Sequence, residues 1–156
     1  MYLNENEFLE PMKVVYELKK ELDANPKKIE EVHALTLDNS RPNQGLSGIN
    51  GLYGTEAWWN NIDKGVIPTR KVSGVIEELY VAGMEGGDVN EFKFLSDDDW
   101  STKSESIRVN NENDRNLFKV GSRVEILYVI EELKSSGHST RRQIPLLLEM
   151  AVSASV

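Results

Sequence analysis

The sequence predicts an α+β protein, in which an N-terminal helical arm precedes a small five-stranded antiparallel β-barrel. Apolar residues near the N-terminus recur at intervals of three and four, as on one face of a helix. In the second half of the chain they recur at every second position, as on one face of a strand. We therefore divide the chain into a helical arm with a glycine-rich linker, residues 1–66, and a barrel, residues 67–156. With 156 residues, the whole chain has the size of a single domain.

The first predicted helix runs from Glu10 to Ala24 and ends before Asn25 and Pro26. Its apolar residues share one face and are expected to pack on the barrel: Phe8, Met12, Val15, Leu18 and Leu22. Asn25 is a favourable helix cap and Pro26 is a favourable first helical residue. A second helix is therefore expected over residues 26–34.

A third, short helix is expected over residues 56–63, where Thr55 can cap it. It carries the adjacent pair Trp58 and Trp59, which cannot both face the same core, so we expect one to be buried and the other to be partly exposed. Residues 36–54, before this helix, are rich in turn formers and glycine. We interpret them as a linker, because they lack the lysine of a phosphate-binding loop.

The final predicted strand has the clearest alternation in the barrel region. Its apolar residues occupy every second position: Ile144, Leu146, Leu148, Met150 and Val152. A period of two indicates a strand with one face in the core. Glu149, which lies between two of these residues, is therefore expected to face solvent.

Four earlier strands are expected over residues 69–82, 89–95 and 102–109, and from residue 123 onward. Glu77 and Glu78 interrupt the first of them and predict a bulge or a bend. The third is polar, which indicates an edge strand, whereas the fourth is apolar on both faces, which indicates burial on both sides. Five such strands are typical of SH3-like and OB-like barrels. Residues 110–118 form a polar loop too short for the helix of an OB barrel, which favours the SH3-like form.

Composition excludes several classes of chemistry. The chain has no cysteine, so disulfides, thiolate metal sites and thiol catalysis are excluded. A net charge of −8 without a basic arm disfavours nucleic acid and anionic membranes as partners. The N-terminal residues lack the pattern of a signal peptide, and no apolar stretch is long enough to span a membrane. We therefore expect a cytoplasmic protein.

The sequence contains no convincing catalytic or metal-binding motif. His33 and His138 lie far apart, and the acids of residues 97–99 lack the spacing of a calcium-binding loop. No serine stands in the glycine pattern of a nucleophile elbow. We therefore expect a protein that is not an enzyme, with no catalytic residue, no metal and no cofactor.

Seven residues are candidate binding residues, three of them tryptophans and four of them bases. Exposed tryptophan is enriched at the hot spots of protein interfaces. The bases form two clusters at strand starts and could contact a nucleic-acid strand if aromatic residues lay nearby. The candidates are Trp58, Trp59, Trp100, Arg70, Lys71, Arg141 and Arg142.

These observations favour a non-catalytic binding module whose partner is another protein. Two alternatives stay open: an OB-like barrel that binds single-stranded nucleic acid, and a regulatory module that responds to a small molecule. A basic groove with stacked aromatic residues would favour nucleic acid, and a deep closed pocket would favour a small molecule. An exposed apolar patch would favour a protein partner. The chain is expected to be a monomer or a homodimer.

Overall fold

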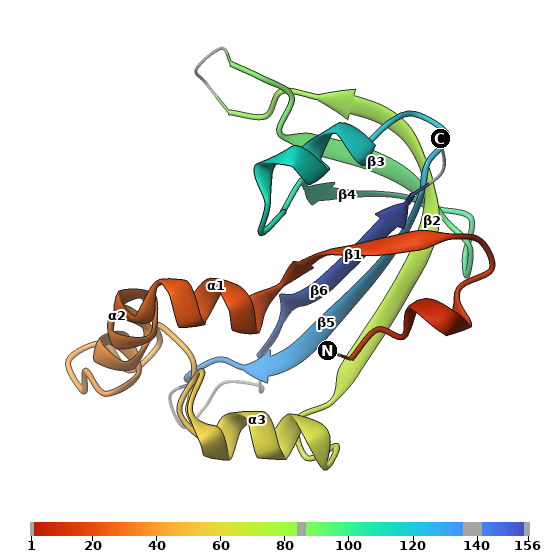
Figure 1. Cartoon of the computed structure of the whole chain (residues 1–156). Helices are drawn as coiled ribbons and strands as arrows, with labels where there is room; N and C mark the ends of the chain where they lie inside the picture. Colours follow the sequence, from red (N-terminus) through yellow and green to blue (C-terminus); the bar gives the residue numbers. More distant parts are fainter. Residues whose placement is uncertain (1, 84–86, 136–141, 155–156) are drawn as a thin grey trace. The chain divides into compact units, whose positions relative to one another are not determined.

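The computed structural model describes residues 2–83, 87–135 and 142–154 and has the predicted α+β class (Figure 1). Six antiparallel strands form one sheet, in the order β1-β6-β5-β2-β3-β4. The strands are β1 (Met12–Glu17), β2 (Thr69–Tyr80), β3 (Glu91–Ser96), β4 (Thr102–Ser106), β5 (Arg123–Glu132) and β6 (Gln143–Ser153). The helices are η1 (Glu5–Glu7), α1 (Leu18–Ala24), α2 (Pro26–Thr36), α3 (Glu56–Asp63) and η2 (Glu112–Leu117), of which η1 and η2 are 3₁₀-helices.

The sheet is open, which corrects the predicted five-stranded barrel. It has six strands and two edges, β1 and β4, so it takes neither the SH3-like nor the OB-like closed form. The additional strand is β1, which pairs with β6. The last strand, β6, therefore pairs with β1 from the N-terminal part of the chain on the side away from β5.

The segment predicted as the first helix is a strand followed by a short helix. Residues of β1 pair antiparallel with β6, and only Leu18–Ala24 is helical. The register shifts between Val14 and Tyr16, so the strict alternation of a strand is broken there. Val15 and Tyr16 are both buried as a result. This irregularity gave the strand the apolar spacing of a helix.

The described residues form two compact units, each made of separate segments. The first comprises Met1–Glu17, Lys71–Leu127 and Leu148–Val156, and the second comprises Leu18–Arg70 and Tyr128–Leu147. Neither unit coincides with the predicted segments 1–66 and 67–156.

The core of the first unit contains a group of aromatic side chains, two of them from β3. Phe92 and Phe94 are almost completely buried, and the Phe92 ring centroid lies 5.5 Å from that of Phe118. The bulge predicted at the two glutamates of β2 is confirmed, because the β2–β3 register shifts between Ile76 and Glu78. β4 is an edge strand, also as predicted. Residues 111–117, expected to be a loop, include the 3₁₀-helix η2.

The expectation that Glu149 faces solvent is wrong. Its side chain lies in the first unit and Glu149 is only 3% exposed, and its carboxylate accepts hydrogen bonds from the backbone N–H groups of Tyr2 (2.8 Å) and Leu3 (2.7 Å). The N-terminal segment thus covers the face of β6 that the alternation assigned to water. Burial, the largest cause, raises the pKa of this carboxyl group above its ordinary value.

The second unit contains the three α-helices, two of which begin where the sequence predicts. Pro26 opens α2, and the Thr55 hydroxyl accepts a hydrogen bond from the Trp58 N–H at the start of α3. Gly54, at φ +75°, lies where an added side chain would press on Ile29 of α2. Residues 136–141, between β5 and β6, lie outside the described residues.

Candidate protein-binding site

The turn between β3 and β4 presents a large aromatic side chain to solvent. Trp100 is 74% exposed and has a φ of +56°, the one positive φ of a non-glycine residue in the part of the chain that the structure describes. Its N–H donates to the Ser96 carbonyl at 3.0 Å, and the Ser96 N–H donates to the Ser101 carbonyl at 2.9 Å. A left-handed conformation costs an ordinary residue about 1–2 kcal/mol. The fold therefore holds this indole in water at a position where glycine would be less strained.

Acidic side chains flank this tryptophan in the same turn. Asp98 is exposed, and the Asp99 carboxylate accepts hydrogen bonds from the Ser101 hydroxyl (2.7 Å) and the Ser101 N–H (3.1 Å). The Lys103 ammonium lies 3.3 Å from the same carboxylate. These contacts, the hydroxyl of Ser101 first, hold the pKa of Asp99 well below its ordinary value. The Asp99 side chain is therefore ionised over the whole physiological pH range.

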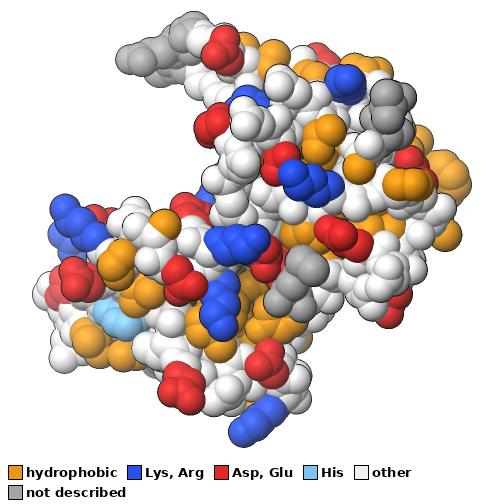
Figure 2. All heavy atoms as spheres, viewed as in Figure 1, with side chains coloured by type: hydrophobic (Ala, Val, Ile, Leu, Met, Phe, Trp, Pro, Cys, Tyr) orange, Lys and Arg blue, Asp and Glu red, His pale blue; other side chains and the backbone are white. Residues whose placement is uncertain are grey.

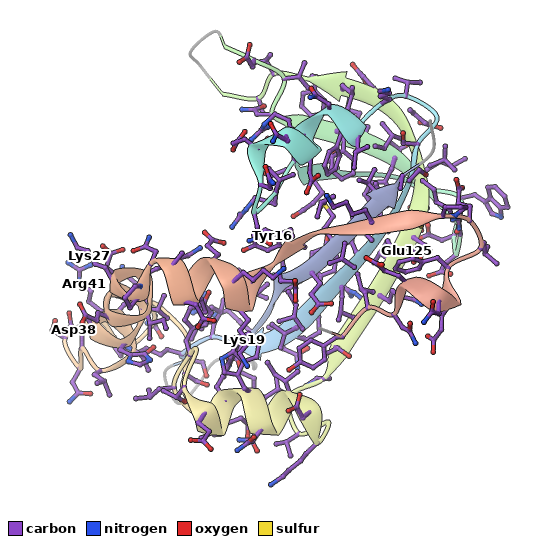
Figure 3. All side chains as sticks on the ribbon, in the orientation of Figure 1. Tyr16, Lys19, Lys27, Asp38, Arg41 and Glu125 are labelled. Atoms are coloured by element: carbon purple, nitrogen blue, oxygen red, sulfur yellow. The ribbon has the colours of Figure 1, made fainter. Side chains whose placement is uncertain are left out.

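A partly buried ionic cluster connects the turn to the rest of the first unit. The Arg123 guanidinium contacts the Asp97 carboxylate, and its Nε lies 3.8 Å from the carboxylate of Glu125 (Figure 3), which is only 6% exposed. The Ser73 hydroxyl donates to Glu125, and the Asp97 N–H donates to the Ser73 carbonyl at 2.9 Å. The residues predicted from the sequence do not include this cluster. Its signal in the sequence is the pair Arg123 and Glu125 at the start of a strand whose middle is apolar.

The adjacent tryptophans of α3 divide as expected. Trp58 is completely buried and its indole N–H donates to the Glu131 carboxylate at 2.9 Å, whereas Trp59 is partly exposed. The Lys19 ammonium, on α1, lies 5.8 Å from the Trp59 ring centroid (Figure 3). Trp58 thus belongs to the core of the second unit and cannot reach a partner in the folded state, whereas a binding role for Trp59 stays a prediction.

The four candidate bases do not all face solvent freely. Arg70 and Lys71 are exposed at the start of β2, whereas the Arg142 guanidinium donates to two backbone carbonyl groups, at 2.9 and 2.8 Å. Arg141 lies outside the described residues. On the face drawn in Figure 2, basic and acidic side chains are interspersed. A binding role for Arg70, Lys71 and Arg142 stays a prediction.

An open groove of about 370 Å³ lies in the second unit. The Lys134 ammonium beside it donates to the backbone carbonyls of Leu35, Asp38 (3.1 Å) and Arg41 (3.2 Å), so its donors already serve the fold. Figure 3 labels Asp38 and Arg41 beside α2. The groove is lined by Asp38, Asn39, Pro42, Ser47, Ile49, Glu132, Leu133, Lys134 and Ser135. It is not the deep closed pocket that would favour a small-molecule ligand.

Within residues 2–83, 87–135 and 142–154, no three His, Cys, Asp or Glu side chains converge as a metal site. Over the same residues, no helix has the length and apolar character needed to cross a membrane.

The sequence matches the family model described as Immunity protein RhsI2 over residues 12–153. The chain belongs to this family. The match begins with the first residue of β1 and ends with the last residue of β6, so it includes the whole sheet and the Trp100 turn. A comparison with curated proteins found no match. An RhsI2 immunity protein binds a toxin protein as its partner, which supports the prediction of a protein-binding module.

Proposed function

We propose that this protein neutralises a cognate toxin by forming a stoichiometric complex with it. The observation that carries the proposal is the RhsI2 family match over almost the whole chain. The exposed tryptophan in a strained and acidic turn supports it, because aromatic residues of this kind are enriched at interface hot spots. We further propose that the protein acts in the cytoplasm, which suits an acidic chain without cysteine.

A titration of toxin activity separates binding from catalysis. The full chain is added in steps to a fixed amount of the purified cognate toxin, and the residual toxic activity is measured. A binding inhibitor abolishes activity at a molar ratio near one and does so without further change over time. An enzyme that modified the toxin would abolish activity at a small fraction of that ratio, increasingly with time, and would contradict the proposal.

Protection of cells provides the second arm. Host cells that express the toxin alone should stop growing, whereas cells that also express the chain should grow normally. Growth arrest despite abundant folded protein would overturn the proposed function.

A further inference from the structure

The β4 strand has a neighbouring strand on one side only, β3. The register of the pair shows which backbone N–H and C=O groups of β4 do not bond to β3. β3 and β4 pair without interruption, from Leu95 opposite Thr102 to Glu91 opposite Ser106. The Ser96 N–H donates to the Ser101 carbonyl, and the Ile107 N–H donates to the Asn90 carbonyl. In an antiparallel ladder such bonded pairs alternate with pairs that do not bond each other. Odd-numbered residues of β4 therefore bond to β3, and the even-numbered ones direct their N–H and C=O groups outward.

Those outward groups belong to Thr102, Ser104 and Ser106. No backbone hydrogen bond from them to another described residue is present. Thr102 and Ser104 are exposed, and their side chains are small. The strand also has no proline and no bulge, two of the devices that block pairing at a sheet edge.

At the opposite edge of the sheet, other segments of the chain form hydrogen bonds to the backbone of β1. The Val14 N–H donates to the carboxylate of Glu5 at 3.2 Å, and the Asn110 N–H donates to the Val15 carbonyl at 2.9 Å. The side chain of Asn110 also bonds both the N–H (2.7 Å) and the C=O (3.3 Å) of Glu17. The chain itself therefore satisfies this edge, whereas the β4 edge is open.

We propose that the toxin adds an extended, basic segment to the open edge of β4, with Trp100 as the anchor at the end of that edge. The inference rests on the proposed function and names the surface that performs it. Strand addition uses backbone hydrogen bonds for affinity and side-chain contacts for specificity. Trp100 lies two residues before Thr102, and the acidic turn that holds it favours a partner segment of positive charge.

A proline at Ser104 tests the edge directly. Its ring removes one outward N–H group and obstructs an incoming strand, but it leaves the bonds from Lys103 and Glu105 to β3 in place. We expect Ser104→Pro to weaken toxin binding on the order of 30-fold or more, the effect of a hot-spot loss. Ser104→Ala is the matched control and should bind within about 3-fold of wild type, since the proposed bonds are made by the backbone. Equal binding by folded Ser104→Pro and wild type would overturn the proposal.

The anchor is tested by Trp100→Gly, which suits the left-handed backbone and so keeps the fold. We expect a loss of toxin affinity of similar size. Leu9→Ala is the control, because Leu9 is an even more exposed apolar residue at 86% and lies far from this turn in the sequence. An equal effect of both variants would overturn the assignment of Trp100 as anchor.

Hydrogen exchange of the wild-type complex needs no variant to fold. In the free protein the amides of Thr102, Ser104 and Ser106 should exchange rapidly, and in the toxin complex they should become protected. Continued rapid exchange in a saturated complex would overturn strand addition, whereas absence of any complex would overturn the proposed function instead. If Ser104→Pro changed only self-association, measured by sedimentation, the occupant would be a second copy of this chain and the proposal would be wrong.

Discussion

Trp100 combines exposure with a backbone conformation that its side chain disfavours. Residues in sparsely populated φ/ψ regions persist only where the surrounding structure imposes them, and they gather at functional sites. Here the ionic cluster of Arg123, Asp97 and Glu125 holds the first residue of the turn. The arrangement lowers stability at one residue and makes a rigid aromatic group available to a partner.

The cost of this conformation can be measured with two substitutions. Trp100→Ala removes the indole and keeps the strain, whereas Trp100→Gly removes both. We expect the glycine variant to be more stable than the alanine variant by about 1 kcal/mol in urea unfolding. A more stable alanine variant would show that the turn is not strained at this residue.

Glu131 is the residue from which we expect a dependence of stability on pH. Burial raises its pKa above the ordinary value of 4.5, although the Trp58 indole N–H donates to it. The folded protein therefore binds the proton more tightly than the unfolded chain. Its contribution to stability is complete below pH 4.5 and is lost as the pH rises through the higher folded pKa.

Glu131→Gln keeps an acceptor for the Trp58 indole and removes the titration. The free energy of unfolding of wild type should fall more steeply than that of the variant as the pH rises from 4.5 toward neutral. Urea unfolding at several pH values measures the free energy of unfolding of wild type and of the variant. The contributions of the other carboxyl groups are the same in both proteins and drop out of the difference. Parallel profiles would contradict the raised pKa.

At the scale of elements, the contact between β2 and β3 depends on a residue without a side chain. An added Cβ at Gly74 would lie 2.2 Å from the Leu95 carbonyl oxygen and 2.7 Å from the Phe94 ring. The backbone of β3 cannot yield without breaking its own pairing. Gly74 is thus required for close strand approach and not for an unusual φ.

We expect Gly74→Ala to destabilise the protein by roughly 1–3 kcal/mol, as overpacking does. Gly87→Ala is the matched control, since an added Cβ there has no atom within 4 Å. Urea midpoints compare the two. Equal midpoints would mean that β2 and β3 can separate more easily than their register indicates.

At the scale of the whole molecule, the net charge of −8 governs non-specific encounters. An acidic surface repels phosphate backbones, and the exposed bases Arg70 and Lys71 are too few to offset it. A filter-binding titration with single-stranded DNA or RNA at physiological salt should therefore show no affinity better than the non-specific range of roughly 10⁻⁴–10⁻⁶ M. A nanomolar constant would make these bases a binding face and contradict a purely protein-directed role.

The sequence by itself determined the fold class, most of the strands and the starts of two helices. Period-two patterns placed Leu148, Met150 and Val152 in the core, the two glutamates of β2 predicted its bulge, and the polarity of β4 identified an edge. These features are local, because each depends on the spacing of residues along one segment. They also sufficed to name Trp100 as a candidate contact.

Only the tertiary structure decided what each strand meets. The register shift in β1 gave its apolar residues a spacing that predicts a helix. The N-terminal backbone buries Glu149 on a face of β6 that the alternation assigned to solvent. The open form of the sheet, the ionic cluster at the Trp100 turn and the unpaired edge of β4 likewise depend on partners distant in the chain. The spacing of residues within a segment reports whether a face is apolar. Which segment covers that face, or whether any does, is settled only by the pairing of remote strands, because hydrogen bonding and burial act between elements.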